Sequence, residues 1–468
     1  MTLWEAIARR AATPGSPWLD DGRRVGLEAL ADASILDGRL EALRGRSVMI
    51  ATEHALTAAL ALIELDGVAR RMVLCTPGLA SEHIPQVVRD AQVDAWVTDA
   101  ASTGPPQGLG SISCVVAHRV PQPSEVDRLG ETSATEWILL TSGTTGGPKL
   151  VAHTLASLTA ACAHRPRGEP GAPIWSTFYD VRRYGGLQIL LRALFFGSLL
   201  LPAAADEPPR EFLARAAAAG VTHISGTPSH WRKALMSGAA QQIRPGYVRL
   251  SGEIADQPIL DALRAAFPHA VVAHAFASTE AGVAFEVQDG LAGFPASLAG
   301  TSAAGVRIDV SRGTLRIKSP GNASRYLGEG APPIKDGEGF VDLGDKLELR
   351  GDRWYFIGRS GGIINVGGLK VHPEEVEAVI NSHPKVRMSL VKPRRNPITG
   401  TVVTAEVVLV AGDDGESGEG PEAPAKRICG EILATCRERL AAHKVPALIR
   451  VVPALEVSAS GKLVRRDA

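Results

Sequence analysis

The sequence predicts an α/β protein with a large N-terminal domain of layered βαβ subdomains and a small α+β C-terminal domain. Up to about residue 285, short apolar runs of strand length alternate with segments of helical spacing. This alternation is typical of parallel sheets covered by helices on both faces. From about residue 305, short segments bounded by Gly and Asp indicate antiparallel strands, before a final alternation of strands and helices.

The first layer of the N-terminal domain is expected ahead of residue 100. Apolar runs predict its strands, and apolar residues three or four positions apart predict its helices. The expected strands are 46–52, 71–75 and 95–98, and the expected helices are 53–66 and 80–91.

The same signals predict a second layer and the antiparallel part. The expected strands of the second layer are 137–140, 198–201, 221–225 and 270–275. Its expected helices are one beginning near His153, then 187–196, 210–219 and 257–267. The antiparallel strands are expected at 314–318 and 354–357.

The composition argues against several classes of protein. Among 468 residues, Lys+Arg and Asp+Glu total 50 each, whereas a nucleic-acid-binding protein would carry a basic footprint. The five cysteines include no C-x-x-C pair, which disfavours a zinc ribbon or a disulfide framework. We see no signal peptide and no apolar run long enough to span a bilayer. We therefore expect a cytoplasmic protein with no membrane span and no nucleic-acid partner.

The sharpest local signal is the segment TSGTTGGPK at residues 141–149. Backbone N–H groups beside glycines, hydroxyl side chains and Lys149 together form an anion cradle, expected here between a strand and a helix. The spacing is not that of a Walker A motif, because Pro148 precedes the lysine and Leu150 follows it. A flexible polar loop is the alternative. The candidate phosphate-binding residues are Thr141, Ser142, Gly143, Thr144, Thr145, Gly146 and Lys149.

This segment resembles the phosphate loop of the adenylate-forming superfamily, which includes acyl-CoA synthetases, carrier-loading adenylation domains and luciferases. Further motifs follow in the family's order from about residue 44 to residue 466. The resemblance implies a small β-barrel-like part and a mobile C-terminal domain. It places the adenylation core, with its nucleotide and acyl pockets, at residues 1–358 and the mobile domain at residues 359–468.

The segment FASTE at residues 276–280 resembles the family's aromatic-Gly-x-Thr-Glu motif, with Ala277 in place of the glycine. The resemblance places Phe276 against adenine, Thr279 on the α-phosphate and Glu280 on Mg²⁺. A carboxylate beside phosphate oxygens suits that hard cation. A helix cap is the alternative role for this Thr-Glu pair.

The segment LGD at residues 343–345 stands where the family has Thr-Gly-Asp. By resemblance, Asp345 accepts hydrogen bonds from the ribose hydroxyls, and Arg359 reaches the ribose. A plain turn aspartate is the alternative. In the family an Asp or Lys marks the hinge at the position of Gly361, and glycine has a freer backbone that can still pivot.

The segment SASGK at residues 458–462 resembles the one that carries the family's adenylation lysine. Lys462 would bridge the carboxylate and the α-phosphate oxygens while the carboxylate attacks ATP and pyrophosphate leaves. The C-terminal domain would then swing, and the loop with Gly367 and Gly368 would admit a thiol. A solvated tail is the alternative for Lys462, and an ordinary turn for the two glycines.

The acyl pocket is expected, from the same resemblance, at residues 175–186, 226–228 and 251–253. Ser-Gly-Glu at 251–253 replaces the usual Gly-Gly-Ala-Pro, so Glu253 is expected to face nucleotide or substrate. Of the arginines at 182 and 183, one is hypothesised to meet a polar or anionic group of the acid, and an ion pair with Asp180 or another carboxylate is the alternative. The candidates are Gly252 and Glu253 for the nucleotide, and Arg182, Tyr184, Gly185, Ser251 and Ala275 for the acid.

Taken together, the motifs predict an ATP- and Mg²⁺-dependent ligase. It would convert a small or medium carboxylic acid to acyl-AMP and transfer the acyl group to a thiol, with CoA as the favoured acceptor. The alternatives are a stand-alone adenylation enzyme that loads carrier-protein pantetheine or forms an amide, and a nucleotide-binding protein without catalysis.

Overall fold

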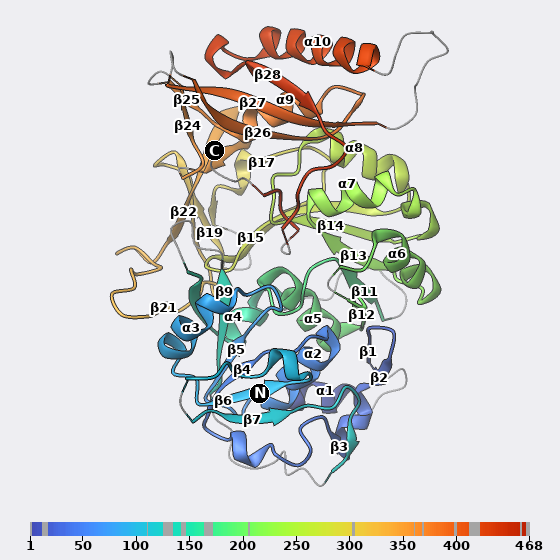
Figure 1. Ribbon diagram of the computed structural model, residues 1–468, viewed down its shortest axis with the longest axis vertical. Helices are drawn as coiled ribbons and strands as arrows, with labels where there is room; N and C mark the ends of the chain where they lie inside the picture. The colour runs from blue at the N-terminus through green and yellow to red at the C-terminus, as the bar shows by residue number, and fades with distance from the viewer. Residues whose placement is uncertain are drawn as a thin grey trace.

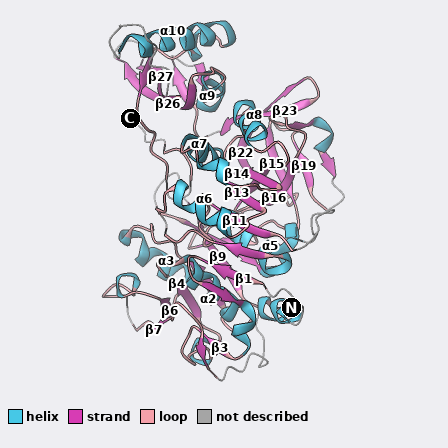
Figure 2. Cartoon of the chain, turned by 90° about the vertical axis from the view of Figure 1, so that its right-hand side faces the viewer, coloured by secondary structure: helices cyan, strands magenta, loops and turns pink. Residues whose placement is uncertain are grey.

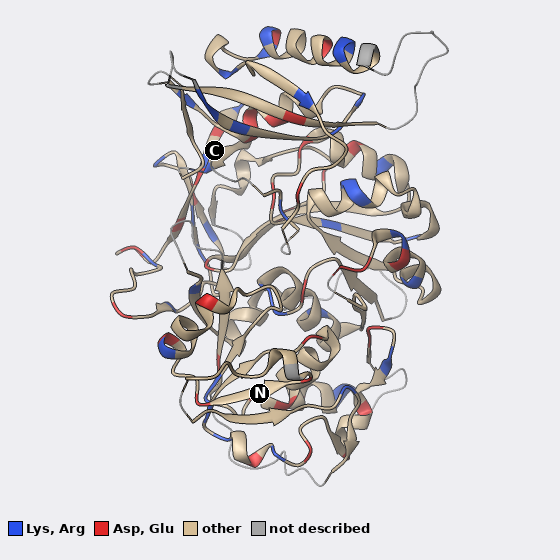
Figure 3. Cartoon of the chain, in the orientation of Figure 1, with Lys and Arg blue, Asp and Glu red and all other residues tan. Residues whose placement is uncertain are grey.

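The computed structural model describes residues 2–11, 17–109, 111–124, 134–141, 147–162, 172–204, 206–301, 305–359, 361–366, 369–396, 400–410, 422–458 and 461–464. Within these ranges, no helix combines the length and the apolar character needed to cross a bilayer. Acidic and basic residues are interspersed along the chain (Figure 3).

The first predicted layer forms a sheet with strand order β21-β10-β9-β5-β4-β6-β7. One placement is corrected: the strand predicted at 137–140 for the second layer is β9, which pairs with β5 in this first sheet. Its members β9, β5, β4, β6 and β7 pair in parallel, and β4, β5 and β6 are buried along their whole length, as expected for strands covered on both faces. The strands are β4 (Ser47–Ile50), β5 (Arg71–Leu74), β6 (Ala95–Thr98), β7 (Ser113–Val116), β9 (Glu136–Thr141), β10 (Lys149–Thr154) and β21 (Arg325–Leu327), and the helices are α2 (Ala55–Leu65), α3 (Ile84–Ala91) and α4 (Leu155–Thr159).

The second layer has the strand order β16-β15-β14-β13-β11-β12-β1-β2, with parallel pairing from β15 through β1. The strands are β1 (Trp18–Asp20), β2 (Arg24–Gly26), β11 (Ile174–Thr177), β12 (Ser198–Leu200), β13 (His223–Gly226), β14 (Tyr247–Ser251), β15 (Val271–Ser278) and β16 (Gly282–Val287). The helices are α1 (Leu3–Ala11), α5 (Tyr184–Phe196), α6 (Pro209–Ala218), α7 (Pro228–Met236) and α8 (Gln257–Ala266).

The segment after the phosphate loop corrects one prediction. The loop was expected to precede a helix, but β10 follows it and pairs antiparallel with β9 from Lys149–Thr141 to Thr154–Glu136. Helix α4 begins only at Leu155. The strand forms because β10 folds back on β9 across the phosphate loop and pairs with it along its whole length. Its residues Leu150 to Ala152 pair on the other side with β21, about 175 positions further along the chain.

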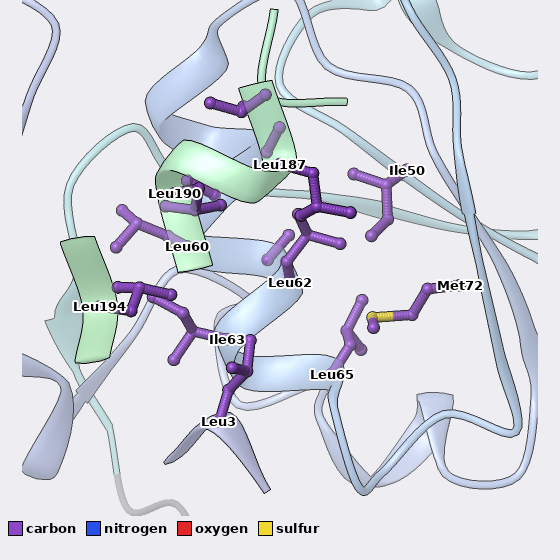
Figure 4. Packing of buried hydrophobic residues seen from close by; sticks show 14 of the residues in the cluster. Leu3, Ile50, Leu60, Leu62, Ile63, Leu65, Met72, Leu187, Leu190 and Leu194 are labelled. Carbon is purple, nitrogen blue, oxygen red and sulfur yellow. The ribbon is translucent and has the colours of Figure 1, made fainter. Parts of the chain in front are cut away.

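The apolar helices α2 and α5 pack between the two layers and hold them together. Helix α2 is buried from Leu56 to Leu65, as expected for a helix that is hydrophobic on all sides. Its side chains interdigitate with those of α5 and α1, and with Ile50 and Met72 from the first sheet (Figure 4). Burying one such side chain contributes about 1.5–3 kcal/mol, so this cluster fixes how the two sheets sit relative to each other.

A third sheet follows, in which all pairs are antiparallel, as the sequence predicts. Its strands are β17 (Phe294–Pro295), β18 (Gly300–Thr301), β19 (Arg307–Asp309), β20 (Thr314–Lys318), β22 (Val341–Arg350) and β23 (Arg353–Arg359). A short pair, β3 (Ala33–Ser34) with β8 (Gln122–Pro123), lies near the N-terminus.

The C-terminal unit lies at the end of the molecule opposite the first sheet, next to α7 and α8 (Figures 1 and 2). Its core sheet has the order β26-β27-β28, and β24 pairs with β25. The elements are β24 (Ile364–Val366), β25 (Leu369–Val371), α9 (Pro373–Asn381), β26 (Val386–Asn396), β27 (Gly400–Leu409), α10 (Glu422–Arg439) and β28 (Leu448–Val451). After β28 the chain returns towards α7 (dark red in Figure 1).

Candidate active site

A cleft opens where the parallel strands β13, β14 and β15 reach their carboxyl ends, the usual place for a ligand in an α/β sheet. The third sheet and the C-terminal unit close its other sides. Of the residues predicted from sequence, it brings together Thr141, Lys149, Gly252, Glu253, Ala275, Phe276, Thr279, Glu280, Asp345, Arg359 and Lys462. Ser142, Gly143, Thr144, Thr145, Gly146, Gly367 and Gly368 lie outside the described residues.

Thr279 is held from the first sheet. The Nε2 atom of His153, on β10, lies 2.7 Å from the Thr279 carbonyl oxygen, and its Nδ1 lies 2.9 Å from Ser157 Oγ. Burial lowers the pKa of His153 to about 4, so the imidazole is neutral near pH 7. The neutral ring donates one hydrogen bond and accepts the other. It thereby ties the predicted α-phosphate residue to the strand that follows the phosphate loop.

Glu280 and Lys149 meet on one aromatic ring. Tyr326, on β21, donates its hydroxyl to Glu280 Oε1 at 3.1 Å. The Lys149 ammonium lies 5.4 Å from the centroid of the same ring, within cation–π range. Tyr326 therefore holds a carboxylate at its hydroxyl and an ammonium over its ring, beside the β9–β10 hairpin that carries the phosphate loop.

Asp345 and Arg359 face each other across the β22–β23 pair. Arg359 Nε donates to Asp345 Oδ1 at 2.8 Å, whereas Asp345 Oδ2 is buried and has no hydrogen-bond partner among the described residues. Burial raises the pKa of Asp345, and Arg359 and Lys462 oppose that effect only in part. The free oxygen is suited to accept a hydrogen bond from a ligand hydroxyl.

Phe276 is half-buried in an aromatic stack. Its ring is nearly parallel to that of Phe356, at 5° and 5.3 Å between centroids, and stacks on Phe285 at 5.9 Å. The stack forms an apolar wall of the cleft, and a flat base could pack against such a wall.

Lys462 reaches this cleft from the far end of the chain. A Cβ atom built on Gly252, which has a φ of +85°, would lie 3.5 Å from Lys462 Cε. The side chain is accessible to solvent within the cleft, although protein atoms surround it. Burial lowers the pKa of Lys462, and Arg359 lowers it further. The lowering is opposed by the carboxylates of Glu253, Asp345 and Glu280.

Of the residues predicted to bind the acid, only Ala275 lines the cleft among those that the structure describes. Arg182 is 2% exposed; it donates to both oxygens of Asp180, at 2.8 and 2.6 Å, and to the Thr52 carbonyl. The ion pair that the sequence left open as its alternative is therefore the one formed. Tyr184, Gly185 and Ser251 also do not line the cleft: Tyr184 is buried in the core, the Tyr179 ring packs against Gly185, and the Tyr179 hydroxyl donates to the Ser251 carbonyl at 2.7 Å.

These residues fit a magnesium nucleotide. Asp345 Oδ2 offers an acceptor for a ribose hydroxyl. Glu280 presents a carboxylate to the cleft, as Mg²⁺ requires. Within the described part of the chain, no group of three or more His, Cys, Asp or Glu forms a metal site. That agrees with an ion whose remaining ligands are phosphate oxygens and water.

Sequence reasoning missed several residues that shape the site. Tyr326 and His153 act through single side chains from distant strands, and nothing around them in the sequence distinguishes them from core residues. His230, in the first turn of α7, was also missed, and Thr227 was predicted only as part of the acyl-pocket segment 226–228; both contact the segment with Lys462. The Thr-Pro pair at 227–228 is a helix-start signal, but it does not indicate that contact.

Comparison with known proteins identifies the family of the chain. A model of the AMP-binding enzyme family matches residues 24–327, and a model of the AMP-binding enzyme C-terminal domain matches residues 375–462. The chain is 28% identical to a 2-succinylbenzoate–CoA ligase of Geobacillus kaustophilus (strain HTA426), over 98% of this chain and 96% of that one.

Two solved structures share the fold. One is an O-succinylbenzoate coenzyme A synthetase (MenE) from Bacillus subtilis in complex with ATP and magnesium ion, with a TM-score of 0.76, 21% identity and coverage of 99% of this chain and 98% of that one. The other is Klebsiella oxytoca NpsA in complex with 3-hydroxyanthranilyl-AMSN, with a TM-score of 0.76, 18% identity and the same coverage. The chain therefore belongs to the AMP-binding enzyme family and is an ATP-dependent, AMP-forming carboxylate–thiol ligase.

Proposed function

We propose that the acid is an aromatic dicarboxylic acid of the 2-succinylbenzoate class and that the acceptor is CoA. The activity of the Geobacillus kaustophilus relative supports this proposal, because the match extends over nearly the whole of both chains. The observation in the structure that supports it most is that two arginines, one buried and one partly buried, each have a buried nitrogen without a hydrogen-bond partner among the described residues.

Arg249, on β14, and Arg192, on α5, form this pair. Arg249 is 3% exposed; its Nε donates to Glu286 at 2.9 Å, while its Nη2 is buried without a hydrogen-bond partner. Arg192 Nη2 donates to the Ala161 carbonyl at 2.9 Å, and its Nε is likewise buried without a partner. Burial raises the pKa of Tyr184, and the charges of Arg249 and Arg192 oppose that rise. Unpaired buried donors are costly, and a carboxylate would satisfy them. Neither arginine lines the cleft itself, so the proposal is that the acyl pocket extends from the cleft to these two donors and that the second carboxylate of the acid binds there.

In the first half-reaction, the carboxylate of the acid attacks the α-phosphorus of ATP and pyrophosphate leaves. Two anions must approach each other, so fixed donors and cations determine the barrier. Thr279, held by His153, faces the α-phosphate, and Lys462 neutralises the approaching carboxylate and the phosphate oxygens. Asp345 and Arg359 hold the ribose, and Phe276 lies against adenine. Glu280 holds Mg²⁺, which supplies charge neutralisation on the phosphates.

In the second half-reaction, residues 359–468 rotate as a domain against residues 1–358 and withdraw Lys462 from the cleft. The proposed hinge is at Gly361, where a Cβ would meet no atom within 4 Å, so the position is open enough to change its backbone angles. The boundary also lies in the gap between the two family matches, which end at 327 and resume at 375. Gly367 and Gly368 are proposed to line the thiol path.

An acid panel in a pyrophosphate exchange assay tests the proposal. 2-Succinylbenzoate should support exchange at least about 10-fold faster than monocarboxylate analogues that lack one of its carboxylates, the effect expected from one charge-assisted hydrogen bond of about 1.5–3 kcal/mol. In Arg249→Gln, the ratio of the exchange rate with 2-succinylbenzoate to the rate with the monocarboxylate analogues should be smaller than in the wild type. Equal rates for all the aromatic acids would contradict the assignment.

A second assay identifies the acceptor. The purified chain is supplied with CoA, with a pantetheine-bearing carrier protein, or with an amine, each with ATP and 2-succinylbenzoate. CoA should give the fastest release of AMP. Faster transfer to the carrier protein or to the amine would overturn the choice of acceptor while leaving the adenylation step in place.

A further inference from the structure

The segment that carries Lys462 is a small hairpin. Val457 and Leu463 form an antiparallel bridge, and Ser458 N donates to the Lys462 carbonyl at 2.8 Å. Gly461 N in turn donates to the Ser458 carbonyl at 2.8 Å. We call the described residues 457–458 and 461–464 the lysine hairpin. A hairpin this small is marginal by itself in water, so its position in the cleft depends on what it contacts.

Glu253 connects the lysine hairpin to the start of α7. Its Oε1 accepts a hydrogen bond from Leu463 N at 3.1 Å and another from Ser229 Oγ at 3.0 Å. Its Oε2 accepts a hydrogen bond from Ser229 N at 2.9 Å, in the first turn of α7. A carboxylate is the side chain suited to this place, because it accepts every bond offered and favours the positive end of a helix.

A second contact lies beside the first. Thr227 Oγ1 donates to the Gly461 carbonyl at 2.6 Å. Gly461 has a φ of +74°, and a Cβ there would lie 1.9 Å from His230 Cε1. The His230 ring is stacked on Phe178 at 5.4 Å, which restricts how far it could give way. The lysine hairpin therefore fits against α7 only with glycine at this position.

We propose that Glu253 is a positioning residue for acid activation: it locks the lysine hairpin against α7 for the first half-reaction and releases it for thiol transfer. The bond to Leu463 N is next to Lys462 in the chain, so the lock fixes the cation where the carboxylate and the α-phosphate meet. This inference rests on the proposed function, in which residues 359–468 take one orientation for acid activation and another for thiol transfer. It replaces the expectation that the Glu253 side chain faces nucleotide or substrate.

Three variants test the lock by separating the two half-reactions. Glu253→Ala removes all the acceptors, and Glu253→Gln keeps one oxygen that can accept from Leu463 N or Ser229. Gly461→Ala leaves Glu253 intact but places a methyl group against His230. Ser229→Ala is the matched control, because it removes one bond to Glu253 and leaves the bond to Leu463 N in place.

Acid-dependent pyrophosphate exchange with 2-succinylbenzoate should fall about 10- to 100-fold in Glu253→Ala and in Gly461→Ala, because a charge-assisted bond or a tight contact is lost. Glu253→Gln should lie between Glu253→Ala and the wild type, and Ser229→Ala should stay near the wild type. Thiolysis by CoA of chemically prepared 2-succinylbenzoyl-adenylate should stay at the wild-type rate in all four variants.

The outcomes are distinct. An equal fall of both half-reactions in Glu253→Ala would show a merely structural role and overturn the lock, as would unchanged exchange. A wild-type chain that shows no exchange with 2-succinylbenzoate but responds to another acid in the panel would instead overturn the proposed acid. The role of Glu253 would then be tested by comparing pyrophosphate exchange in the four variants and the wild type with that other acid.

Discussion

At the scale of single residues, Asp345 is a group in the cleft whose hydrogen bonds are incomplete among the described residues. Arg359 engages one carboxylate oxygen at 2.8 Å and the other is buried without a partner in the described structure. An unsatisfied buried acceptor costs free energy in the protein alone and is satisfied when a ribose hydroxyl donates to it. Asp345 is therefore expected to contribute to nucleotide binding more than to the folding of the chain.

Asp345→Ala tests this expectation. The KM for ATP should rise about 10- to 100-fold, because hydrogen bonds to charged groups contribute about 1.5–3 kcal/mol. Steady-state kinetics with varied ATP at saturating acid would measure it. The KM for the acid should change little. A rise in the KM for the acid alone would place Asp345 on the other substrate.

Local motifs in the sequence were enough to predict the nucleotide residues that line the cleft, because Phe276, Thr279, Glu280 and Asp345 lie in short recognisable segments. They wrongly placed in the cleft most of the residues predicted for the acid. They were also not enough to predict the partners of the residues in the cleft. Glu253 shows the reason: its partners Ser229 and Leu463 are 24 and 210 positions away. Contacts of that kind are produced by the tertiary fold, and single-sequence patterns do not encode them.

At the scale of elements, α7 and α8 form the surface that receives the C-terminal unit. Asp256 caps α8 by accepting from Ile259 N at 3.1 Å. The same carboxylate accepts from Arg232 Nη2 at 2.7 and 2.6 Å and from Asn381 Nδ2 of α9 at 3.1 Å. One side chain thus combines a helix cap with a contact between the two parts of the chain.

Replacing Asp256 separates these roles. Asp256→Ala should lower the free energy of unfolding by about 0.5–2 kcal/mol for the cap alone, with a further loss from the Arg232 ion pair. Asp256→Asn should retain most of the cap, because the amide oxygen can still accept from Ile259 N. Urea titrations of both variants would compare them. Equal midpoints for Asn and Ala would mean that the cap contributes nothing measurable.

The elements themselves were largely predictable, with one informative exception. Apolar runs such as 71–74 and 95–98 indicate parallel strands because both faces of those strands are buried. Strand β10 was missed because a glycine-rich turn before an apolar segment fits a strand-to-helix turn as well as a β-hairpin, and here β10 pairs with β9 along its whole length. The phosphate loop consequently belongs to a β-hairpin, and no helix N-terminus directly follows it.

At the scale of the whole molecule, buried histidines determine how the fold responds to acid. Burial lowers the pKa of His153, His223 and His230 to about 4, whereas an exposed imidazole titrates near 6.5. Between about pH 6.5 and 4 the unfolded chain therefore binds more protons, and stability falls as the pH falls. Asp66 acts in the opposite direction, because burial raises its pKa to about 6.

The histidines outnumber that aspartate, so the melting temperature should be lower at pH 5 than at pH 7.5. Each histidine contributes at most about 1.4 kcal/mol per pH unit across this range. Differential scanning calorimetry of the wild type and of His223→Gln would measure the effect, and the variant should show a smaller drop. A melting temperature that rises on acidification would contradict the assignment of neutral buried rings.

The most direct test of the central claim compares the two half-reactions in Lys462→Ala, with the exposed Lys426→Ala on α10 as the matched control. Removing one cation aimed at the transition state should lower acid-dependent pyrophosphate exchange by about 10²–10³-fold, while thiolysis of supplied acyl-adenylate by CoA keeps its wild-type rate. Lys426→Ala should retain both rates. Exchange at the wild-type rate in Lys462→Ala, or an equal loss of both half-reactions, would contradict the account.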